Sequence, residues 1–246
     1  MKALILAAGR GTRMGALTAT LPKPMVPVRG VPILETILTG LRDAAGISEF
    51  FLIVGYQGEV IRNHFGNGTK WNVAITYGVQ EVQDGTGKAP EIAQAWIGQD
   101  PFFLSYGDIL LDEPADYAGL AESWREDRPD GVVGLVTGQD LTKGGAIVLD
   151  AAGNVARIVE KAAPDAIPAN AYYNSGVYLL TPRIFDFTAR LEKSPRGEYE
   201  LTDALRGIAA NGRLKGAFFK GEWVDVRDPE VLASLNSSGP ASAPGR

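Results

Sequence analysis

Short apolar runs and amphipathic stretches alternate along the first half of the chain. Four runs have the length and the β-branched and aromatic content of strands, at residues 2–7, 50–54, 73–77 and 102–106. The stretches between them have the apolar spacing of helices, at residues 33–44, 59–65 and 91–96. Strands that are apolar throughout and alternate with helices are typical of a parallel sheet covered by helices on both faces.

The second half of the chain has more strands and fewer helices. Apolar runs separated by glycine, asparagine and proline lie at residues 131–136, 146–150, 155–160 and 172–180, which predicts antiparallel or mixed additions to the same sheet. Helices are expected at residues 182–189, 201–210 and 229–235. The sequence therefore predicts an α/β fold with a mixed, mainly parallel central sheet and helices on both faces.

The length and composition of the chain fit one folded domain. A chain of 246 residues with 45% hydrophobic residues can bury a large core, and we assign residues 1–235 to a single domain. Residues 236–246, Asn-Ser-Ser-Gly-Pro-Ala-Ser-Ala-Pro-Gly-Arg, have almost nothing to bury, so a disordered tail is expected there.

The charge balance narrows the classes of ligand. With 24 basic and 29 acidic residues the net charge is -5, which argues against nucleic acid or an anionic membrane as the main partner. The chain has no cysteine, so thiolate metal sites and a cysteine nucleophile are excluded. The apolar start at residues 1–8 is too short for a signal peptide or a membrane span, and a cytoplasmic protein is expected.

A glycine-rich segment with basic residues follows the first predicted strand. Gly9 and Gly11 allow the backbone to approach a phosphate and point amides at it. Arg13, together with Lys23 in Pro-Lys-Pro-Met, can neutralise the phosphate charge. Glycines alone would fit a tight turn equally well, but the carboxyl end of a strand is where open α/β sheets bind ligands. The segment therefore predicts a phosphate-binding loop.

Two known phosphate motifs fit this loop badly. A Walker loop ends in Gly-Lys-Ser/Thr, which the segment lacks. Gly9, Gly11 and Gly15 approximate the dinucleotide fingerprint, but that motif needs a helix to begin at once. Pro22 and Pro24 prevent a long helix here. An NAD-binding oxidoreductase is therefore the less favoured alternative, and a loop that wraps a ligand is expected.

Two aspartates are candidates for a metal site. Asp108 follows the predicted strand at residues 102–106, at the sheet edge of the glycine loop, and Asp225 lies in Trp-Val-Asp-Val far along the chain. A turn or helix cap would explain either aspartate alone. Two carboxylates that converge on phosphate oxygens are what Mg²⁺ prefers.

These motifs together resemble one family. Leu-Ala-Ala-Gly-Arg-Gly-Thr-Arg-Met followed by Pro-Lys-Pro-Met is similar to the signature of sugar-phosphate nucleotidyltransferases, the NDP-sugar pyrophosphorylases, especially the glucose-1-phosphate thymidylyltransferase and uridylyltransferase group. The resemblance covers about residues 1–235. It implies the Rossmann-like, GT-A-like nucleotidyltransferase fold. It also implies a Mg²⁺-dependent enzyme that condenses a nucleoside triphosphate, with dTTP or UTP favoured, and a sugar 1-phosphate of the glucose or N-acetylglucosamine type, and releases pyrophosphate.

The resemblance also implies roles for residues in the nucleotide half. Arg13 would grip the outer phosphates, Lys23 would bridge toward the reacting phosphate, and Asp108 and Asp225 would bind Mg²⁺. The amide of Gln80 and the backbone of Gly85 would bind a pyrimidine base. The implied nucleotide-binding set is Leu6, Ala8, Gly9, Gly11, Thr12, Arg13, Lys23, Gln80 and Gly85. After Gly85 this chain has Thr86 and Gly87, where the thymidylyl branch of the family usually has leucine followed by alanine.

Three later segments, at residues 144–148, 159–161 and 173–178, match three successive motifs of the family that bind the sugar phosphate. By that match Gly145 offers backbone contact to the hexose, Glu160 accepts from its hydroxyls, Lys161 holds the sugar phosphate and Asn174 reaches the hydroxyls. Taken singly, each segment fits a solvated strand end or a turn. The only histidine, His64, is interpreted as structural.

The implied reaction needs no side-chain nucleophile, because the attacking phosphate oxygen is already anionic. Arg13, Lys23 and Lys161 would carry catalysis by neutralising charge and positioning the substrates. A non-catalytic sugar-nucleotide sensor is the alternative from another class, although it would be expected to have lost some of these residues. The resemblance leaves a homo-oligomer open.

Overall fold

The computed structural model describes residues 1–237. The strands are β1 (Lys2–Ala7), β2 (Pro27–Val28), β3 (Val31–Pro32), β4 (Glu49–Val54), β5 (Ala74–Val79), β6 (Phe102–Tyr106), β7 (Ile109–Leu111), β8 (Gly131–Val136), β9 (Gly145–Leu149), β10 (Val155–Glu160), β11 (Tyr172–Leu180), β12 (Leu214–Phe218) and β13 (Trp223–Asp225). The α-helices are α1 (Ile33–Ala45), α2 (Gly58–Phe65), α3 (Gln94–Ile97), α4 (Ala115–Asp127), α5 (Ile184–Thr188), α6 (Leu201–Ala210) and α7 (Pro229–Ser237). Short 3-10 helices are η1 (Thr12–Thr18), η2 (Lys23–Met25), η3 (Thr69–Trp71), η4 (Ala89–Ala93), η5 (Leu141–Lys143) and η6 (Pro164–Ala166).

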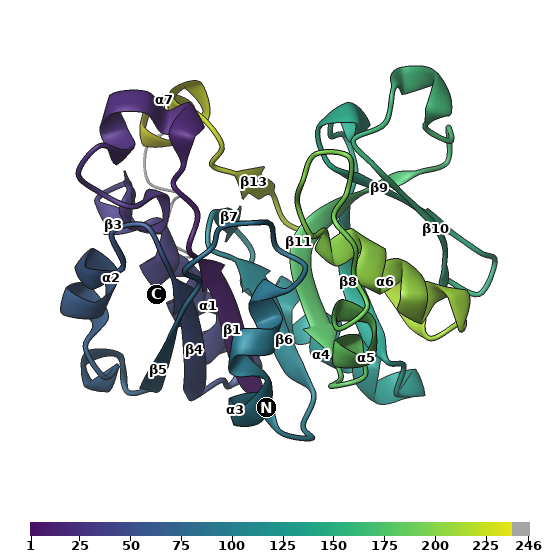
Figure 1. Ribbon diagram of the computed structural model, residues 1–246, viewed down its shortest axis with the longest axis horizontal. Coiled ribbons are helices and arrows are strands. Elements are labelled where there is room, and N and C mark those ends of the chain that lie inside the picture. Colours follow the sequence, from purple (N-terminus) through teal and green to yellow (C-terminus); the bar gives the residue numbers. More distant parts are fainter. Residues whose placement is uncertain (238–246) are drawn as a thin grey trace, which may run out of the picture.

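One large mixed sheet forms the centre of the molecule (Figure 1). Its main order is β10-β9-β11-β6-β1-β4-β5, and β8 pairs with both β11 and β12. The half made of β6, β1, β4 and β5 is parallel, whereas β11 runs antiparallel to β6, β8 and β9. The predicted fold class, with a parallel first half and antiparallel additions, is confirmed.

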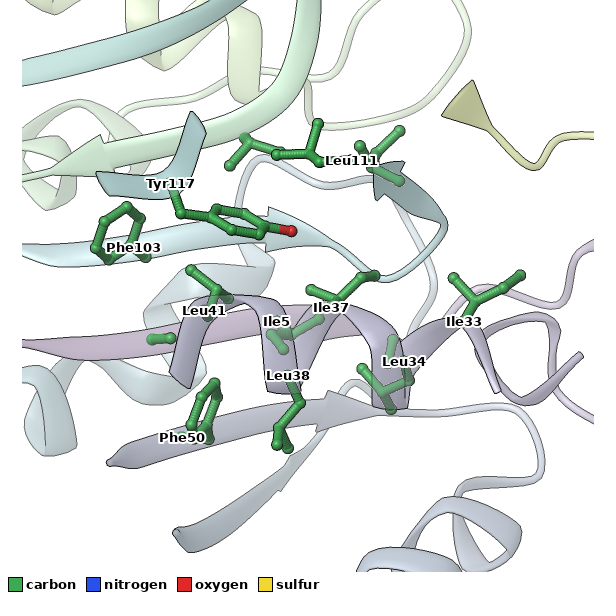
Figure 2. Close-up of a cluster of buried hydrophobic side chains, with 14 of the residues drawn as sticks. Ile5, Ile33, Leu34, Ile37, Leu38, Leu41, Phe50, Phe103, Leu111 and Tyr117 are labelled. Carbon is green, nitrogen blue, oxygen red and sulfur yellow. The ribbon is translucent and has the colours of Figure 1, made fainter. Parts of the chain in front are cut away.

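Helices cover both faces of this sheet, as the uniformly apolar strands predict. In β1 the side chains of Ala3 and Ile5 lie in the core cluster that contains α1 and α4, whereas Leu4 lies in the cluster that contains α6. All three are fully buried. Figure 2 shows α1 lying alongside the strands, and its residues Ile37 and Leu38 are buried in the same cluster as Ile5. Because successive strand residues point to opposite faces, a central strand must be apolar at every position.

The predicted elements are confirmed with boundaries shifted by a few residues, with one exception. The helix expected at residues 91–96 is instead the 3-10 helix η4 followed by the one-turn helix α3, which ends before Gly98, where φ is +70°. The first two residues of the expected tail, Asn236 and Ser237, belong to helix α7. The rest of that tail, residues 238–246, lies outside the described residues. No helix in the described part of the chain is long and apolar enough to cross a membrane.

Helix α4 and the strands β7, β12 and β13 were not predicted. The buried residues of α4, Tyr117, Leu120 and Trp124, have helical spacing, but polar and small residues dominate its other positions. β7 and β13 have three residues each, which is too short to show a strand periodicity. These two strands form a separate antiparallel ribbon, which lies between the two halves of the large sheet (Figure 1).

Candidate active site

A cleft of about 600 Å³ opens beside the carboxyl ends of β1 and β6. Most of the residues predicted to bind ligand contribute to its walls: Leu6, Ala8, Gly9, Arg13, Lys23, Gln80, Gly85, Asp108, Gly145, Glu160, Lys161, Asn174 and Asp225. Of the predicted set, Gly11 and Thr12 are not part of the lining. The structure therefore brings both predicted halves of the site together in one cavity.

Gly11 does not line the cleft but packs closely against Lys23, which does. It has a φ of +64°, and a Cβ at this position would lie 2.7 Å from Cβ of Lys23. The chain therefore needs glycine here both for the left-handed backbone and for the close passage of the lysine. The hydroxyl of Thr18 donates to the carbonyl of Gly11 at 3.0 Å. Gly11 thus shapes the loop that carries Arg13 and sets the path of Lys23.

Lys23 lies between the two predicted metal ligands. Its Nζ is 2.5 Å from Oδ2 of Asp108 and 3.7 Å from Oδ1 of Asp225. Pro24 at the second position of η2 starts the short helix that directs this side chain inward, and Lys23 is only 7% exposed. A buried ammonium needs this carboxylate pairing, because desolvation of an unpaired charge is costly.

The ribbon of β7 and β13 places the two aspartates side by side. Asp225 pairs with Ile109, and the N–H of Val226 donates to the carbonyl of Asp108 at 3.0 Å. Burial and the neighbouring Asp108 carboxylate raise the pKa of Asp225, while Lys23 and Arg227 oppose the rise. Nε of Arg227 lies 3.6 Å from Oδ2 of Asp225. The partly buried carboxylates of Asp108 and Asp225 therefore depend on nearby cations, which here are Lys23 and Arg227.

The predicted base-binding segment is held by internal contacts. Nε2 of Gln80 donates to the carbonyl of Gly85 at 2.9 Å. Gly85 has a φ of +115° and packs on Tyr199, where a Cβ would lie 2.3 Å from the Tyr199 carbonyl oxygen. The N–H of Tyr199 donates to the carbonyl of Asp84 at 2.7 Å. One donor of Gln80 therefore holds the loop, which leaves its oxygen as an acceptor for a ligand.

The other end of the cleft is built on the β9–β10 hairpin. Glu160 pairs with Gly145, where an added Cβ would lie 3.1 Å from Oε2 of Glu160. Lys161 follows with a φ of +43°, and its N–H donates to the carbonyl of Gly144 at 2.9 Å. Left-handed backbone in a residue other than glycine is costly and is often found at functional sites. Burial raises the pKa of Glu160, and the adjacent Lys161 opposes the rise.

A bulge in β11 places Asn174 in the cleft. The pairing of β11 with β8 shifts after Asn174, and Oδ1 of Asn174 accepts the N–H of Gly176 at 3.1 Å. Nε1 of Trp223 donates to the carbonyl of Ser175 at 2.8 Å. Trp223 is 7% exposed and tilts over the Tyr173 ring. The tryptophan therefore ties the ribbon that carries Asp225 to the strand that carries Asn174.

Several residues that line the cleft had no chemical role assigned from the sequence. They are Gln83, Tyr106, Lys143, Glu198, Glu200 and Thr202, among others. Tyr106 is the last residue of β6, two residues before Asp108, so its position at the strand end could have marked it as a site residue. Burial raises the pKa of Tyr106 to about 12. Glu198 and Glu200 come from the segment before α6, and Thr202 lies in the first turn of that helix. They reach the cleft only through tertiary packing.

His64 does not contribute to the cleft. Its Nε2 lies 2.9 Å from Oε2 of Glu35, and its ring packs against those of Phe65 and Trp71. The pKa of Glu35 is lowered because hydrogen bonds to His64 and Trp71 outweigh the opposing effect of burial. The surroundings of His64 agree with the structural role expected for it.

The glycine loop does not open an α-helix. It continues into the 3-10 segment η1, which is interrupted at Gly15 by a φ of +58°. The dinucleotide fingerprint requires an α-helix whose N-terminus faces the pyrophosphate. The loop geometry therefore argues against the NAD-binding alternative.

Comparison with known proteins identifies the class. The family described as nucleotidyl transferase matches residues 2–238. This is nearly the whole chain, and the chain therefore belongs to the nucleotidyl transferase family, as its motifs predict.

Relatives of known name show the same class. The chain is 35% identical over 237 residues to the bifunctional protein GlmU of Methanococcus maripaludis, covering 96% of this chain and 54% of that protein. It is 34% identical over 238 residues to the low-salt glycan biosynthesis nucleotidyltransferase Agl11 of Haloferax volcanii, covering 96% and 65%. It is 34% identical over 233 residues to the UTP–glucose-1-phosphate uridylyltransferase AglF of Haloferax volcanii, covering 94% and 93%. The chain thus spans about half the length of the GlmU relative.

Solved structures share the fold over nearly their full length. A candidate glucose-1-phosphate thymidylyltransferase from Bacillus anthracis, in complex with sucrose, matches with a TM-score of 0.86 and 26% identity over 100% of this chain and 98% of that chain. A UDP-glucose pyrophosphorylase in complex with UDP-glucose matches with a TM-score of 0.85 and 26% identity over 96% of each chain. The Rossmann-like nucleotidyltransferase fold is therefore confirmed.

Proposed function

We propose that this chain is a magnesium-dependent sugar-1-phosphate nucleotidyltransferase, which joins a nucleoside triphosphate to a sugar 1-phosphate and releases pyrophosphate and an NDP-sugar. One observation carries the proposal: Lys23, Asp108 and Asp225 meet within a single cleft. Arg13 and Lys161 line the same cleft and bring further positive charge to it. Two phosphorylated substrates need this arrangement of cations in a protein of net charge -5.

The reaction follows from the charges of the substrates. An oxygen of the sugar phosphate attacks the α-phosphorus, a new O–P bond forms, and the bond to the β-phosphate oxygen breaks, so that pyrophosphate leaves with the electron pair. The nucleophile is already anionic and needs no base. Arg13 and Lys23 neutralise the triphosphate, and Lys161 holds the sugar phosphate in line.

Asp108 and Asp225 fit a divalent cation. Their oxygens are hard ligands, and Oδ1 of Asp225 is buried with no hydrogen-bond partner within residues 1–237. Over the same residues there is no group of three or more histidine, cysteine and acidic side chains that could hold a metal. Two carboxylates leave the other coordination positions to water and phosphate oxygens, as Mg²⁺ prefers. When bound, the ion would offset phosphate charge during the displacement.

The substrate assignment follows the two ends of the cleft. Leu6, Ala8, Gly9, Gln80 and Gly85 form the nucleotide end, where the Gln80 oxygen suits the N–H of a uracil or thymine imide. UTP and dTTP are therefore favoured, in agreement with the names of AglF and of the Bacillus anthracis structure.

The sugar end of the cleft presents groups that suit hydroxyls. Gly145, Glu160 and Asn174 line it beside Lys161. A half-buried carboxylate and an amide accept and donate hydrogen bonds to a hexose, while the lysine suits its phosphate. Glucose 1-phosphate and N-acetylglucosamine 1-phosphate are the substrates we favour here.

A substrate matrix tests the proposal. Several nucleoside triphosphates are combined with several sugar 1-phosphates in the presence of Mg²⁺, and pyrophosphate release is measured. We expect the highest rates for UTP or dTTP with a glucose-type sugar phosphate. The Asp225→Asn variant, purified in the same way, is the blank for contaminating enzymes.

The non-catalytic sensor gives a different result in the same experiment. A sensor would release no pyrophosphate from any pair, yet an NDP-sugar would still raise its melting temperature. The presence of Arg13, Lys23, Asp108, Lys161 and Asp225 together in one cleft favours the enzyme.

A further inference from the structure

Asp116 is a buried carboxylate outside the cleft. It lies in the first turn of α4 and is 6% exposed. Its two oxygens accept hydrogen bonds from the main-chain N–H of Lys220, at 2.9 and 3.1 Å, and Oδ2 also accepts the N–H of Gly221 at 3.0 Å. One side chain thus binds two successive amides from a segment 104 and 105 residues further along the chain.

These amides belong to the turn that leads into the ribbon. Residues 219–222 join β12 to β13. A Cβ on Gly221 would lie 2.4 Å from Oδ1 of Asp112, and the N–H of Asp112 donates to the carbonyl of Glu222 at 3.1 Å. The turn is therefore pressed against the start of α4, and the Asp116 carboxylate fixes its main chain there.

The ribbon itself is too short to set its own register. β13 has three residues and carries Asp225 at its end, opposite Ile109 of β7. Because successive strand residues point to opposite sides, a shift by one residue would turn Asp225 away from Asp108. Three residue pairs offer little resistance to such a shift, so the register must be held from outside the ribbon.

We propose that Asp116 is a positioning residue for the metal site. By binding the amides of Lys220 and Gly221 it sets where β13 begins, and it thereby keeps the Asp225 carboxylate beside Asp108. The hydrogen bond from Trp223 to β11 holds the other side of the ribbon. This inference rests on the proposed role of the two aspartates as Mg²⁺ ligands.

The Asp116→Asn variant tests the proposal. The amide keeps the size of the side chain but removes its negative charge, and it places an NH2 donor where Oδ1 accepts the N–H of Lys220 at 2.9 Å, so the amides of the turn are held less firmly. Partners that orient metal ligands typically change metal affinity by roughly 10- to 100-fold when they are lost. We expect the Mg²⁺ concentration for half-maximal pyrophosphate release to rise about tenfold or more, while KM for the sugar 1-phosphate stays nearly constant.

A second readout does not depend on turnover. Mn²⁺ binding to the protein, measured by electron paramagnetic resonance without substrates, should weaken by a similar factor in Asp116→Asn. Gly221→Ala pushes the same turn away from Asp112 and should weaken Mn²⁺ binding in the same way. This variant keeps the test open if Asp116→Asn does not fold.

Leu120→Val is the matched control. It removes a buried methylene group from the same helix, at a residue 1% exposed, and should lower the melting temperature without changing metal dependence. Unchanged metal binding in folded Asp116→Asn and Gly221→Ala, or an equal change in Leu120→Val, would overturn the proposal. If the wild type releases no pyrophosphate from any substrate pair, the proposed function fails, whereas the Mn²⁺ titration still decides the role of Asp116.

Discussion

The ammonium group of Lys23 lies 2.5 Å from Oδ2 of Asp108, across 85 residues of sequence. The contact joins the segment after the glycine loop to the end of β6, and Asp225 approaches the same ammonium from the ribbon at 3.7 Å. The Lys23 ammonium therefore lies between both carboxylates, and Arg227 provides a second cation beside Asp225. In the proposed reaction, the same Lys23 ammonium must interact with the reacting phosphate once the nucleoside triphosphate is bound.

Replacing Lys23 by alanine should remove most of the activity. The variant loses the cation nearest the two carboxylates, and loss of one charge-stabilising donor typically costs about 10²–10³ in turnover. Pyrophosphate release at saturating substrates measures the effect, and circular dichroism shows whether the protein is folded. Lys215→Ala removes a lysine that pairs with Asp127 on the surface and should leave turnover unchanged. A nearly wild-type rate in folded Lys23→Ala would exclude the assigned role.

The same variant should respond more strongly to Mg²⁺ alone. Without Lys23, the partly buried carboxylates of Asp108 and Asp225 would repel each other. A bound divalent cation would reduce this repulsion and so stabilise the folded protein. We therefore expect Mg²⁺ without nucleotide to raise the melting temperature of Lys23→Ala by more than that of the wild type, and EDTA to reverse the gain. The double variant with Asp225→Asn should lose the gain. Equal shifts in wild type and variant would contradict this prediction.

Gly11 and Gly46 should differ in their tolerance of alanine. Both have αL backbone, with ψ of 39° and 29°, which costs an alanine about 1–2 kcal/mol. Only at Gly11 does the added Cβ also meet another side chain, 2.7 Å from Cβ of Lys23, whereas a Cβ at Gly46 has no atom within 4 Å. Gly11→Ala should therefore lose about 1–3 kcal/mol more stability by overpacking, together with activity. Chemical denaturation measures both variants, and equal losses would show that the contact with Lys23 is unimportant.

Glu160 should lower the stability of the ligand-free protein at neutral pH. Burial raises its pKa above the usual value of 4.5, so the favourable contribution of the protonated carboxyl is lost as the pH rises through the folded-state pKa. Glu160→Gln cannot ionise and should melt at a higher temperature than the wild type at neutral pH, with a gain that shrinks as the pH falls through the folded-state pKa toward 4.5. Its KM for the sugar 1-phosphate should rise.

Glu198→Gln is the control for this pH dependence. Glu198 lines the same cleft but is exposed, so its substitution should change the melting temperature little at any pH. A lower melting temperature for Glu160→Gln at neutral pH would show that ionised Glu160 stabilises the fold instead.

Local patterns predicted those site residues that follow a clear strand. The glycine loop follows β1, Asp108 comes two residues after β6, and Glu160 ends β10. In a parallel sheet the carboxyl ends of neighbouring strands share one edge, so the strand pattern already places the loop near Asp108. The helix α4, which carries Asp116, was missed because its apolar positions are few and its surface is polar.

By itself, the sequence determined the parallel core of the sheet, the position of the glycine loop and the family, because apolar periodicity and a motif of adjacent residues are local properties. Only the tertiary structure decided that Asp225 meets Asp108 and that Asp116 holds the turn before it. These contacts depend on three-residue strands and on main-chain hydrogen bonds. A main-chain amide is the same in almost every residue, so no side-chain pattern marks where such a contact will form.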